Sequence, residues 1–324
     1  HSETEANNLA LLGYALANKG ISKRIIISEI EPLSILHASE LLSKNGFKVI
    51  KVPVNNEGLI DLDELSKVVD KETILVSIML VNHEIGTIEP IKEAVEIVKD
   101  NNPNTIFHTD ASDAYGKIPV DVKKIGVDLM SLSSHKILGP RGAGALYVKE
   151  GTKIERIIEG QIGTQQLWPD LENVPSLVGF AKASELAFNN FSENVNHMKE
   201  LRDTLIEGIL NGVDSTLLNG PLGEKRAPDN VNISYLHVEG EALTIELSLS
   251  GIYVSSGSAC TRRLLQPSHV LLALGRKFEE AHGSILMKVT RYHTKDDIDY
   301  VLKVLPKAVK RLRGITGHIE LGGG

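Results

Sequence analysis

The sequence of 324 residues contains a single cysteine, Cys260, so a disulfide bond within the chain is excluded. Such scarcity suits a reducing compartment, and we expect a cytoplasmic protein. The sequence also lacks any apolar run near the roughly 18 residues that a membrane-spanning helix needs, and no signal peptide is visible. We therefore expect no association with a membrane.

The sequence has no dense block of lysine and arginine, and its formal net charge is −7. Both features argue against a nucleic acid as the main partner, because nucleic acids require basic surfaces. A composition of 42% hydrophobic and 24% charged residues is ordinary for a globular protein with a sizeable core. The chain begins at His1 rather than methionine, and we interpret it as lacking an N-terminal segment.

Short apolar runs alternate with segments of helical spacing through the first half of the sequence. This alternation predicts an α/β fold in which a mainly parallel sheet is covered by helices on both faces. In such sheets ligands bind beyond the carboxyl ends of the strands, and His83, Asp110 and the segment 133–136 all follow predicted strands. The predicted strands span residues 24–28, 47–54, 73–81, 105–109, 127–132 and 144–148.

The second half of the sequence has a different pattern. Residues 171–211 have the spacing of two long helices, and the stretch 220–229 is rich in glycine, proline and charged residues, which predicts a linker. Shorter strands and helices follow, as in a small α+β domain. We therefore expect a large domain over residues 1–219 and a small C-terminal domain over residues 220–324 that carries Cys260.

Cys260 lies in the run Ser255-Ser-Gly-Ser-Ala-Cys-Thr261, among small and polar residues. Structural cysteines usually have apolar neighbours, because a free thiol packs as a small hydrophobe. The run favours a nucleophilic thiol carried on a loop, and an inert, buried thiol is the simpler alternative.

A second group of residues suggests a site for an aldehyde cofactor. Lys136 ends the run Ser131-Leu-Ser-Ser-His-Lys136 before a glycine-rich turn, where loss of solvent would lower its pKa and make the amine nucleophilic. Asp110, one strand earlier, is placed to pair with the pyridine nitrogen of pyridoxal phosphate. Thr4 and the helix start around it could bind a phosphate. The simpler alternatives are a surface lysine and two residues that cap helices.

Further segments form a set with those around Cys260 and Lys136. The set comprises Thr4-Glu-Ala-Asn-Asn-Leu9, Val81-Asn-His-Glu-Ile-Gly86, His108-Thr-Asp-Ala111, Ser133-Ser-His-Lys136 with Gly139-Pro-Arg-Gly142, Glu172-Asn-Val-Pro175, Val254-Ser-Ser-Gly-Ser-Ala-Cys-Thr261 with Pro267-Ser-His-Val270, and Arg291. Over essentially the whole chain these segments resemble the class V pyridoxal-phosphate enzymes, and among them the cysteine desulfurases. The segments around Lys136 and Cys260 are the most specific.

The resemblance implies a fold type I transferase with a seven-stranded type of sheet, and pyridoxal 5′-phosphate as the cofactor. Lys136 would bond to the cofactor aldehyde, and Asp110 would hold its pyridine nitrogen. Thr4, Ser133 and His135 would bind its phosphate. No metal is implied.

The resemblance also implies the reaction. Arg291 would pair with the carboxylate of L-cysteine, which suits a bidentate guanidinium. Cys260 would take the substrate sulfur as a persulfide and L-alanine would leave. The loop after Cys260 resembles the long-loop branch, which passes sulfur to an acceptor or scaffold protein for iron–sulfur cluster or tRNA and cofactor synthesis. A homodimer is implied as well.

Five positions depart from the pattern of the cysteine desulfurases. Pro32 stands where a histidine covers the cofactor ring, and His83 replaces an asparagine and could take over a ring contact. Asp113 replaces a glutamine near the cofactor, and Leu171 replaces a threonine that contacts phosphate from the partner subunit. Glu3 near a phosphate would be repulsive.

These departures leave two alternatives to an active desulfurase. One is a related class V enzyme, such as an aminotransferase or a selenocysteine lyase-like enzyme. The other is a non-catalytic homologue that keeps the fold and the dimer surface but binds the cofactor weakly.

Overall fold

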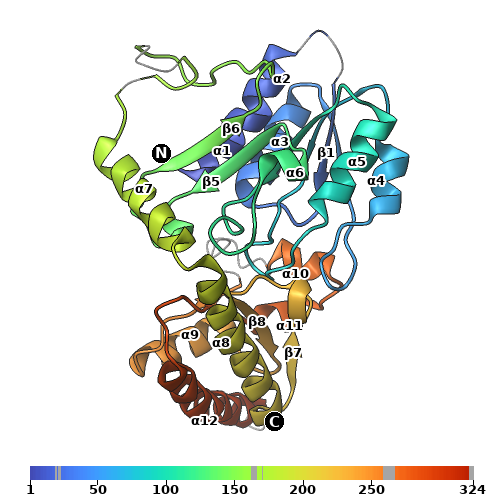
Figure 1. Cartoon of the computed structure of the whole chain (residues 1–324). Coiled ribbons are helices and arrows are strands. Elements are labelled where there is room, and N and C mark those ends of the chain that lie inside the picture. Colours follow the sequence, from blue (N-terminus) through green and yellow to red (C-terminus); the bar gives the residue numbers. More distant parts are fainter. Residues whose placement is uncertain (19, 21–22, 162–165, 170, 258–266, 321–324) are drawn as a thin grey trace. The chain divides into compact units, whose positions relative to one another are not determined.

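The computed structural model describes residues 1–18, 20, 23–161, 166–169, 171–257 and 267–320 (Figure 1). The chain divides into two compact units. The first unit comprises His1–Val54, Leu59–His83 and Ile88–Phe191, and the second comprises Asn55–Gly58, Glu84–Thr87 and Ser192–Gly324.

The first unit contains a six-stranded sheet with the strand order β2-β1-β3-β4-β5-β6. All neighbouring strands are parallel except β5 and β6, because the short connection 134–143 between them leaves no room for a crossover helix. The mainly parallel sheet is confirmed, with one strand fewer among the described residues than the expected seven-stranded type. The strands are β1 (Arg24–Ser28), β2 (Lys48–Val52), β3 (Thr73–Ser77), β4 (Ile106–Asp110), β5 (Leu129–Ser133) and β6 (Gly144–Val148).

Helices cover both faces of this sheet (Figure 1). Ile25 and Ile27 of β1 belong to an apolar cluster with residues of η1, α2 and α3, whereas Ile26 is buried on the opposite face. The helical segments are α1 (Glu3–Asn8), η1 (Leu9–Gly13), α2 (Tyr14–Ala17), α3 (Leu33–Lys44), α4 (Leu62–Val68), α5 (Ile91–Asn101), α6 (Val122–Ile125), η2 (His135–Ile137) and α7 (Val174–Phe188).

Helix ends follow from local chemistry. The Asp61 carboxylate accepts a hydrogen bond of 2.9 Å from the Glu64 N–H and so caps the start of α4. Gly46 has a φ of +86° just beyond α3, a conformation that glycine adopts without strain. These ends set the lengths of the connections that return the chain to the sheet.

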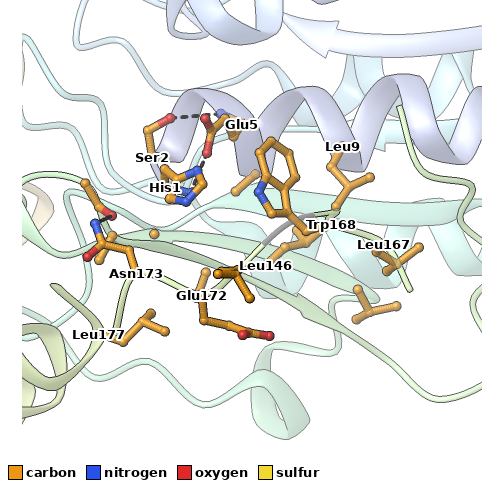
Figure 2. Close-up of a pocket in the computed structure, with 17 residues that line it drawn as sticks. His1, Ser2, Glu5, Leu9, Leu146, Leu167, Trp168, Glu172, Asn173 and Leu177 are labelled. Carbon is orange, nitrogen blue, oxygen red and sulfur yellow. Dashed lines mark hydrogen bonds and ion pairs between the residues drawn. The ribbon is translucent and has the colours of Figure 1, made fainter. Parts of the chain in front are cut away.

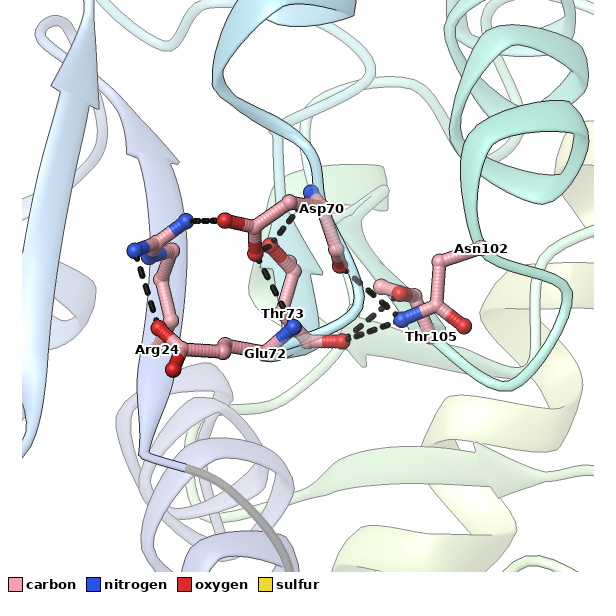
Figure 3. A network of polar contacts seen from close by, with 6 residues as sticks. All are labelled: Arg24, Asp70, Glu72, Thr73, Asn102 and Thr105. Carbon is pink, nitrogen blue, oxygen red and sulfur yellow. Dashed lines mark hydrogen bonds and ion pairs between the residues drawn. The ribbon is translucent and has the colours of Figure 1, made fainter.

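A polar network joins the amino ends of β1, β3 and β4, at the edge opposite the carboxyl ends (Figure 3). Arg24 forms an ion pair with Asp70, and the Asp70 N–H donates to the Thr73 hydroxyl at 3.1 Å. The Thr73 carbonyl accepts hydrogen bonds from the Asn102 amide at 3.1 Å and the Thr105 hydroxyl at 2.7 Å. Backbone groups that the strands leave unpaired are satisfied in this way.

The second unit contains a four-stranded sheet with the order β7-β8-β10-β9, and all its neighbouring strands are antiparallel. Its strands are β7 (Thr216–Leu218), β8 (Asn230–Tyr235), β9 (Ser255–Ser256) and β10 (Ser284–Lys288). Its helical segments are α8 (Phe191–Gly212), η3 (Gly223–Lys225), α9 (Gly240–Leu249), α10 (His269–Ala273), α11 (Phe278–His282) and α12 (Lys295–Glu320). No helix in the described part of the chain is long and apolar enough to cross a membrane.

The stretch 220–229 is not the expected linker, because it packs inside the second unit. The Arg226 side chain is 1% exposed and donates to the Pro221 carbonyl and, at 2.8 Å, to the Asn230 amide oxygen. The compact units divide near Phe191 rather than at residue 219. The reason is α8, whose apolar residues Leu205 and Ile209 join the core of the second unit.

Glu89 is a buried carboxyl group in the first unit. Its side chain accepts a hydrogen bond of 3.0 Å from the Ile60 N–H, and only 3% of the residue is exposed. Burial raises the pKa of Glu89 from 4.5 to about 8, so the folded state holds a proton that the unfolded chain releases above pH 4.5. The contribution of Glu89 to stability therefore falls as pH rises from about 4.5 to about 8.

We expect Glu89→Gln to remove this pH-dependent loss, because the amide cannot ionise. Denaturant unfolding at pH 5 and pH 9 should show a smaller loss of unfolding free energy in the variant, by on the order of a few kcal/mol. Glu93→Gln, at an exposed position of α5, is the control and should lose as much unfolding free energy between pH 5 and pH 9 as the wild type does. An equal loss of unfolding free energy in Glu89→Gln and wild type would contradict the prediction.

Candidate active site

The candidate site lies where β4 and β5 end side by side. Asp110 is the last residue of β4 and is paired with Ser131 of β5, which ends two residues later at Ser133. After Ser134 the chain forms the short helix η2 (His135–Ile137), which contains Lys136. Parallel pairing therefore brings Asp110 and Lys136 to one edge of the sheet, as the sequence predicts.

A tight turn holds Lys136 at this edge. The Gly139 N–H donates to the Ser134 carbonyl at 3.0 Å, and Leu138 adopts a φ of +68°. A Cβ atom on Gly139 would lie 2.2 Å from the Ser134 hydroxyl oxygen, so any other residue at this position would displace that hydroxyl. The glycine that the sequence places after Lys136 thus has a steric role.

Lys136 forms an ion pair with Asp113. Its Nζ lies 2.7 Å from Asp113 Oδ2, and Lys117 Nζ lies 3.5 Å from the other carboxylate oxygen. Asp113 is 5% exposed, Lys117 is 9% exposed and Lys136 is 23% exposed. One buried carboxylate therefore bridges two lysines.

The expectation that Lys136 has a lowered pKa is wrong. Burial by itself lowers the pKa, but the carboxylates of Asp113, Glu3 and Asp110 outweigh it, and the pKa of Lys136 lies above its ordinary value. The sequence shows the desolvating turn, whereas the opposing carboxylates come from segments that meet Lys136 only in the fold. Lys136 is an ammonium at neutral pH.

Asp110 is buried and has partners for both carboxylate oxygens. The Asn7 amide donates to Oδ2 at 2.7 Å, and the Ser112 N–H donates to Oδ1 at 2.8 Å. Burial raises the pKa of Asp110 although both hydrogen bonds lower it. The bond to Ser112 resembles the capping alternative, but the bond to Asn7 does not, because Asn7 comes from α1.

The Glu3 carboxyl group interacts electrostatically with Asp110 and Lys136. Its pKa is raised to about 7, first by burial and then by the nearby carboxylate of Asp110, while Lys136 partly opposes the shift. The raised pKa favours the neutral form of Glu3, which reduces the repulsion that the sequence predicts toward a phosphate.

Two of the three expected phosphate-binding residues contact one another. Ser133 is buried, and its hydroxyl lies 2.7 Å from His135 Nδ1. Burial lowers the pKa of His135, and the charge of Lys136 lowers it further. Thr4 lies on the exposed side of α1, and Ser2 rather than Thr4 caps this helix by accepting from the Glu5 N–H at 3.2 Å.

The remaining predicted site residues are His83, Arg291 and Cys260. His83 belongs to the first unit and follows Asn82, whose amide donates to the Ile30 carbonyl at 3.0 Å. Arg291 belongs to the second unit, where its guanidinium lies 4.7 Å from the centroid of the Tyr292 ring. Cys260 lies outside the described residues.

Sequence reasoning did not single out Asn7 or Lys117. Asn7 is completely buried on a helical face that continues through Ala10 and Leu11. A polar residue in such an apolar stripe was the available signal. Lys117 carries no signal in the sequence, since an isolated lysine after a turn usually faces solvent.

A separate pocket of about 300 Å³ lies between α1, β6 and the segment that leads into α7 (Figure 2). Its lining includes Glu5, Leu146, Trp168 and Leu177, and the rings of His1 and Trp168 meet edge to face with centroids 5.6 Å apart. Lys136 and Asp110 do not line it, so this pocket is not the cluster at the strand ends.

Comparison with known proteins identifies the family. Residues 1–301 match the aminotransferase class-V family. The chain belongs to the aminotransferase class-V family. It is 44% identical over 313 residues to cysteine desulfurase IscS 1 of Archaeoglobus fulgidus, a match that covers 97% of this chain and 81% of the relative.

Two further relatives of this class V chain agree. Cysteine desulfurase IscS of Clostridium botulinum is 45% identical over 314 residues, covering 97% of this chain and 79% of the relative. The solved structure of a NifS-like protein is similar with a TM-score of 0.89 and 37% identity, over 96% of this chain and 81% of that one. The cofactor of this class V chain is pyridoxal phosphate.

The side chains at the ends of β4 and β5 are of the types that bind pyridoxal phosphate. The buried Asp110 carboxyl suits a pyridine nitrogen, and the hydroxyl and imidazole of Ser133 and His135 are hydrogen-bonding groups suited to phosphate oxygens. The Ser134 hydroxyl is buried without a partner among the described residues, which leaves a further donor for such a group. No cluster of metal-binding side chains occurs in the described ranges.

We expect Asn7→Ala to destabilise the first unit by about 1–3 kcal/mol, because it leaves the Oδ2 atom of the buried Asp110 carboxyl without its hydrogen-bond donor. Asn8→Ala is the matched control on the same helix, since the Asn8 amide donates at 2.8 Å to the Thr4 carbonyl in an exposed position. Chemical denaturation compares the two variants. Equal losses of unfolding free energy would rule out a specific role for the buried pair.

Proposed function

We propose that the chain is a pyridoxal-phosphate-dependent cysteine desulfurase, a sulfurtransferase that acts on L-cysteine and releases L-alanine. The proposal rests on two observations together: residues 1–301 match the family, and Lys136 and Asp110 lie at adjacent strand ends. Relatives named cysteine desulfurase, at 44–45% identity, support the same activity.

In this proposal Lys136 provides the amine that bonds to the cofactor, and Asp113 holds a proton on its Nζ. Asp110 binds the pyridine nitrogen, and Ser133 and His135 bind the phosphate. Bound pyridoxal phosphate supplies the electron sink that allows bonds of the amino acid to break. The raised pKa of Asp110 favours this role, since a cationic ring nitrogen restores the ionised carboxylate that burial alone disfavours.

Thr4, His83 and Arg291 complete the proposed set. Thr4 binds the phosphate, His83 contacts the cofactor ring, and Arg291 binds the substrate carboxylate through two parallel hydrogen bonds. The chain offers these residues at the positions of the family pattern.

Cys260 carries the sulfur in the proposed reaction. Its thiolate attacks the sulfur of L-cysteine, a sulfur–sulfur bond forms and the carbon–sulfur bond breaks. The electron pair of the broken bond stays on carbon, which takes up a proton, so that alanine leaves and a persulfide remains on Cys260. We propose an acceptor or scaffold protein as the destination of this sulfur, in iron–sulfur cluster assembly or a thio-cofactor or tRNA route, in the cytoplasm.

The test is the visible absorption spectrum of the purified chain with pyridoxal phosphate, with and without L-cysteine. Lys136→Ala should abolish the lysine-dependent absorption band. Cys260→Ser should keep the band but reduce sulfide release by more than about 100-fold, because it removes the only nucleophilic thiol. Lys149→Ala, at an exposed lysine, should match wild type in both measurements.

The spectrum also separates the second candidate function, a non-catalytic homologue that binds the cofactor weakly. The carboxylates of Asp113 and Glu3 favour this candidate, because each brings negative charge toward a phosphate-bearing ligand. A chain that stays colourless with excess pyridoxal phosphate would exclude the desulfurase. Conversion of L-cysteine to its keto acid, with no alanine, sulfide or persulfide, would instead indicate a related class V activity of the aminotransferase kind.

We propose that a second copy of the chain covers an apolar patch formed by Leu171, Val174, Leu177 and Val178. These side chains are 81%, 59%, 41% and 64% exposed, and the last three share one face of α7. The patch adjoins the pocket of Figure 2, to which Leu171 and Leu177 contribute. Contiguous exposed apolar surface of this kind marks interaction sites.

We expect Val178→Glu to break the homodimer, because association would bury an unpaired charge. Light scattering after size exclusion should give twice the chain mass of 35.3 kDa for wild type and a single chain mass for the variant. Leu249→Glu is the control, since Leu249 of α9 is also highly exposed, at 79%. A wild-type protein with a single chain mass would refute the dimer.

A further inference from the structure

We propose that Asp113 restrains the reactivity of Lys136 toward aldehydes by fixing a proton on its Nζ. The inference rests on the proposed function, because it concerns the lysine that this function assigns to the cofactor. An amine attacks an aldehyde carbon only through a free electron pair, so an ammonium must lose its proton first. Asp113 therefore acts as a positioning residue that sets the pH at which Lys136 reacts.

The geometry of Asp113 carries this proposal. Its Oδ2 lies 2.7 Å from Lys136 Nζ, within the range of a charge-assisted hydrogen bond. Its second oxygen lies 3.5 Å from Lys117 Nζ, so ion pairs on both sides hold the carboxylate in place. The carboxylate is only 5% exposed, and burial limits the screening of its charge by solvent.

Other charged groups around Lys136 either favour or oppose its protonated form. Glu3 from α1 and Asp110 from the end of β4 favour the ammonium, and Glu3 adds more negative charge as it ionises around pH 7. Lys117 and His135 oppose it where they are charged. Asp113 is the only one of the three carboxylates with a direct hydrogen bond to Nζ in the described residues.

The test measures aldehyde capture at single lysines rather than enzyme activity. The full chain, freed of bound aldehyde with hydroxylamine, is treated with pyridoxal, which has no phosphate, in the presence of cyanoborohydride from pH 7 to pH 11. The Nζ–carbon bond forms, one water leaves and the reductant supplies hydride, so that a stable secondary amine results. Peptide mass spectrometry then gives the labelled fraction of Lys136 at each pH.

We expect the labelling midpoint of Lys136 to fall by about one to three pH units in Asp113→Asn, because an opposite charge in contact shifts a pKa by that amount. Asp113→Glu retains the charge and should keep a midpoint close to wild type. Asp128→Asn is the matched control, because Asp128 also bridges two lysines, with Lys99 at 2.7 Å and Lys149 at 3.0 Å. It should leave the midpoint of Lys136 unchanged.

An unchanged midpoint in Asp113→Asn would overturn the inference and leave the proposed function intact. Absence of labelling at Lys136 at every pH in both proteins would instead overturn the assignment of Lys136 to the cofactor. If Asp113→Asn does not fold, wild type alone decides the matter. Its Lys136 must then react with a higher midpoint than Lys124, which is 85% exposed, and an equal or lower midpoint would overturn the inference.

Discussion

The parallel pairing of β4 with β5 is the constraint on which the candidate site depends. Backbone hydrogen bonds fix Asp110 beside Ser131, and both strands end within two residues of this point. The residues that follow therefore emerge at one edge of the sheet, and the turn closed by Gly139 keeps Lys136 there. At the opposite edge, the network around Thr73 and Asn102 provides hydrogen bonds for the amino ends of the strands.

Charge in the site is unbalanced toward carboxylates. Asp110, Asp113 and Glu3 surround Lys136, and all three act to keep its amine protonated. Burying such groups costs free energy unless they pair, which explains why Asp113 bridges two lysines and why the pKa of Glu3 rises. Perturbed groups of this kind gather at functional sites more often than elsewhere, and here they coincide with the family match.

The sequence predicted the strands of the first sheet to within a few residues, because strand patterns are local. The run 144–148 is a strand with the predicted bounds, and the alternation of strands and helices gave the correct fold class. Two interpretations were wrong for the same reason. The polar stretch 220–229 lacks a local sign that Arg226 is buried, and the turn after Lys136 lacks a local sign of the carboxylates that face it.

By itself the sequence determined the alternation of strands and helices, the family pattern, and which lysine, aspartate and cysteine the proposed chemistry uses. Only the tertiary structure decided the protonation of that lysine and the partners of that aspartate. The physical reason is distance along the chain: Asp113 lies 23 residues from Lys136, and Asn7 lies 103 residues from Asp110. Electrostatic energies depend on separation in space, which no local pattern specifies.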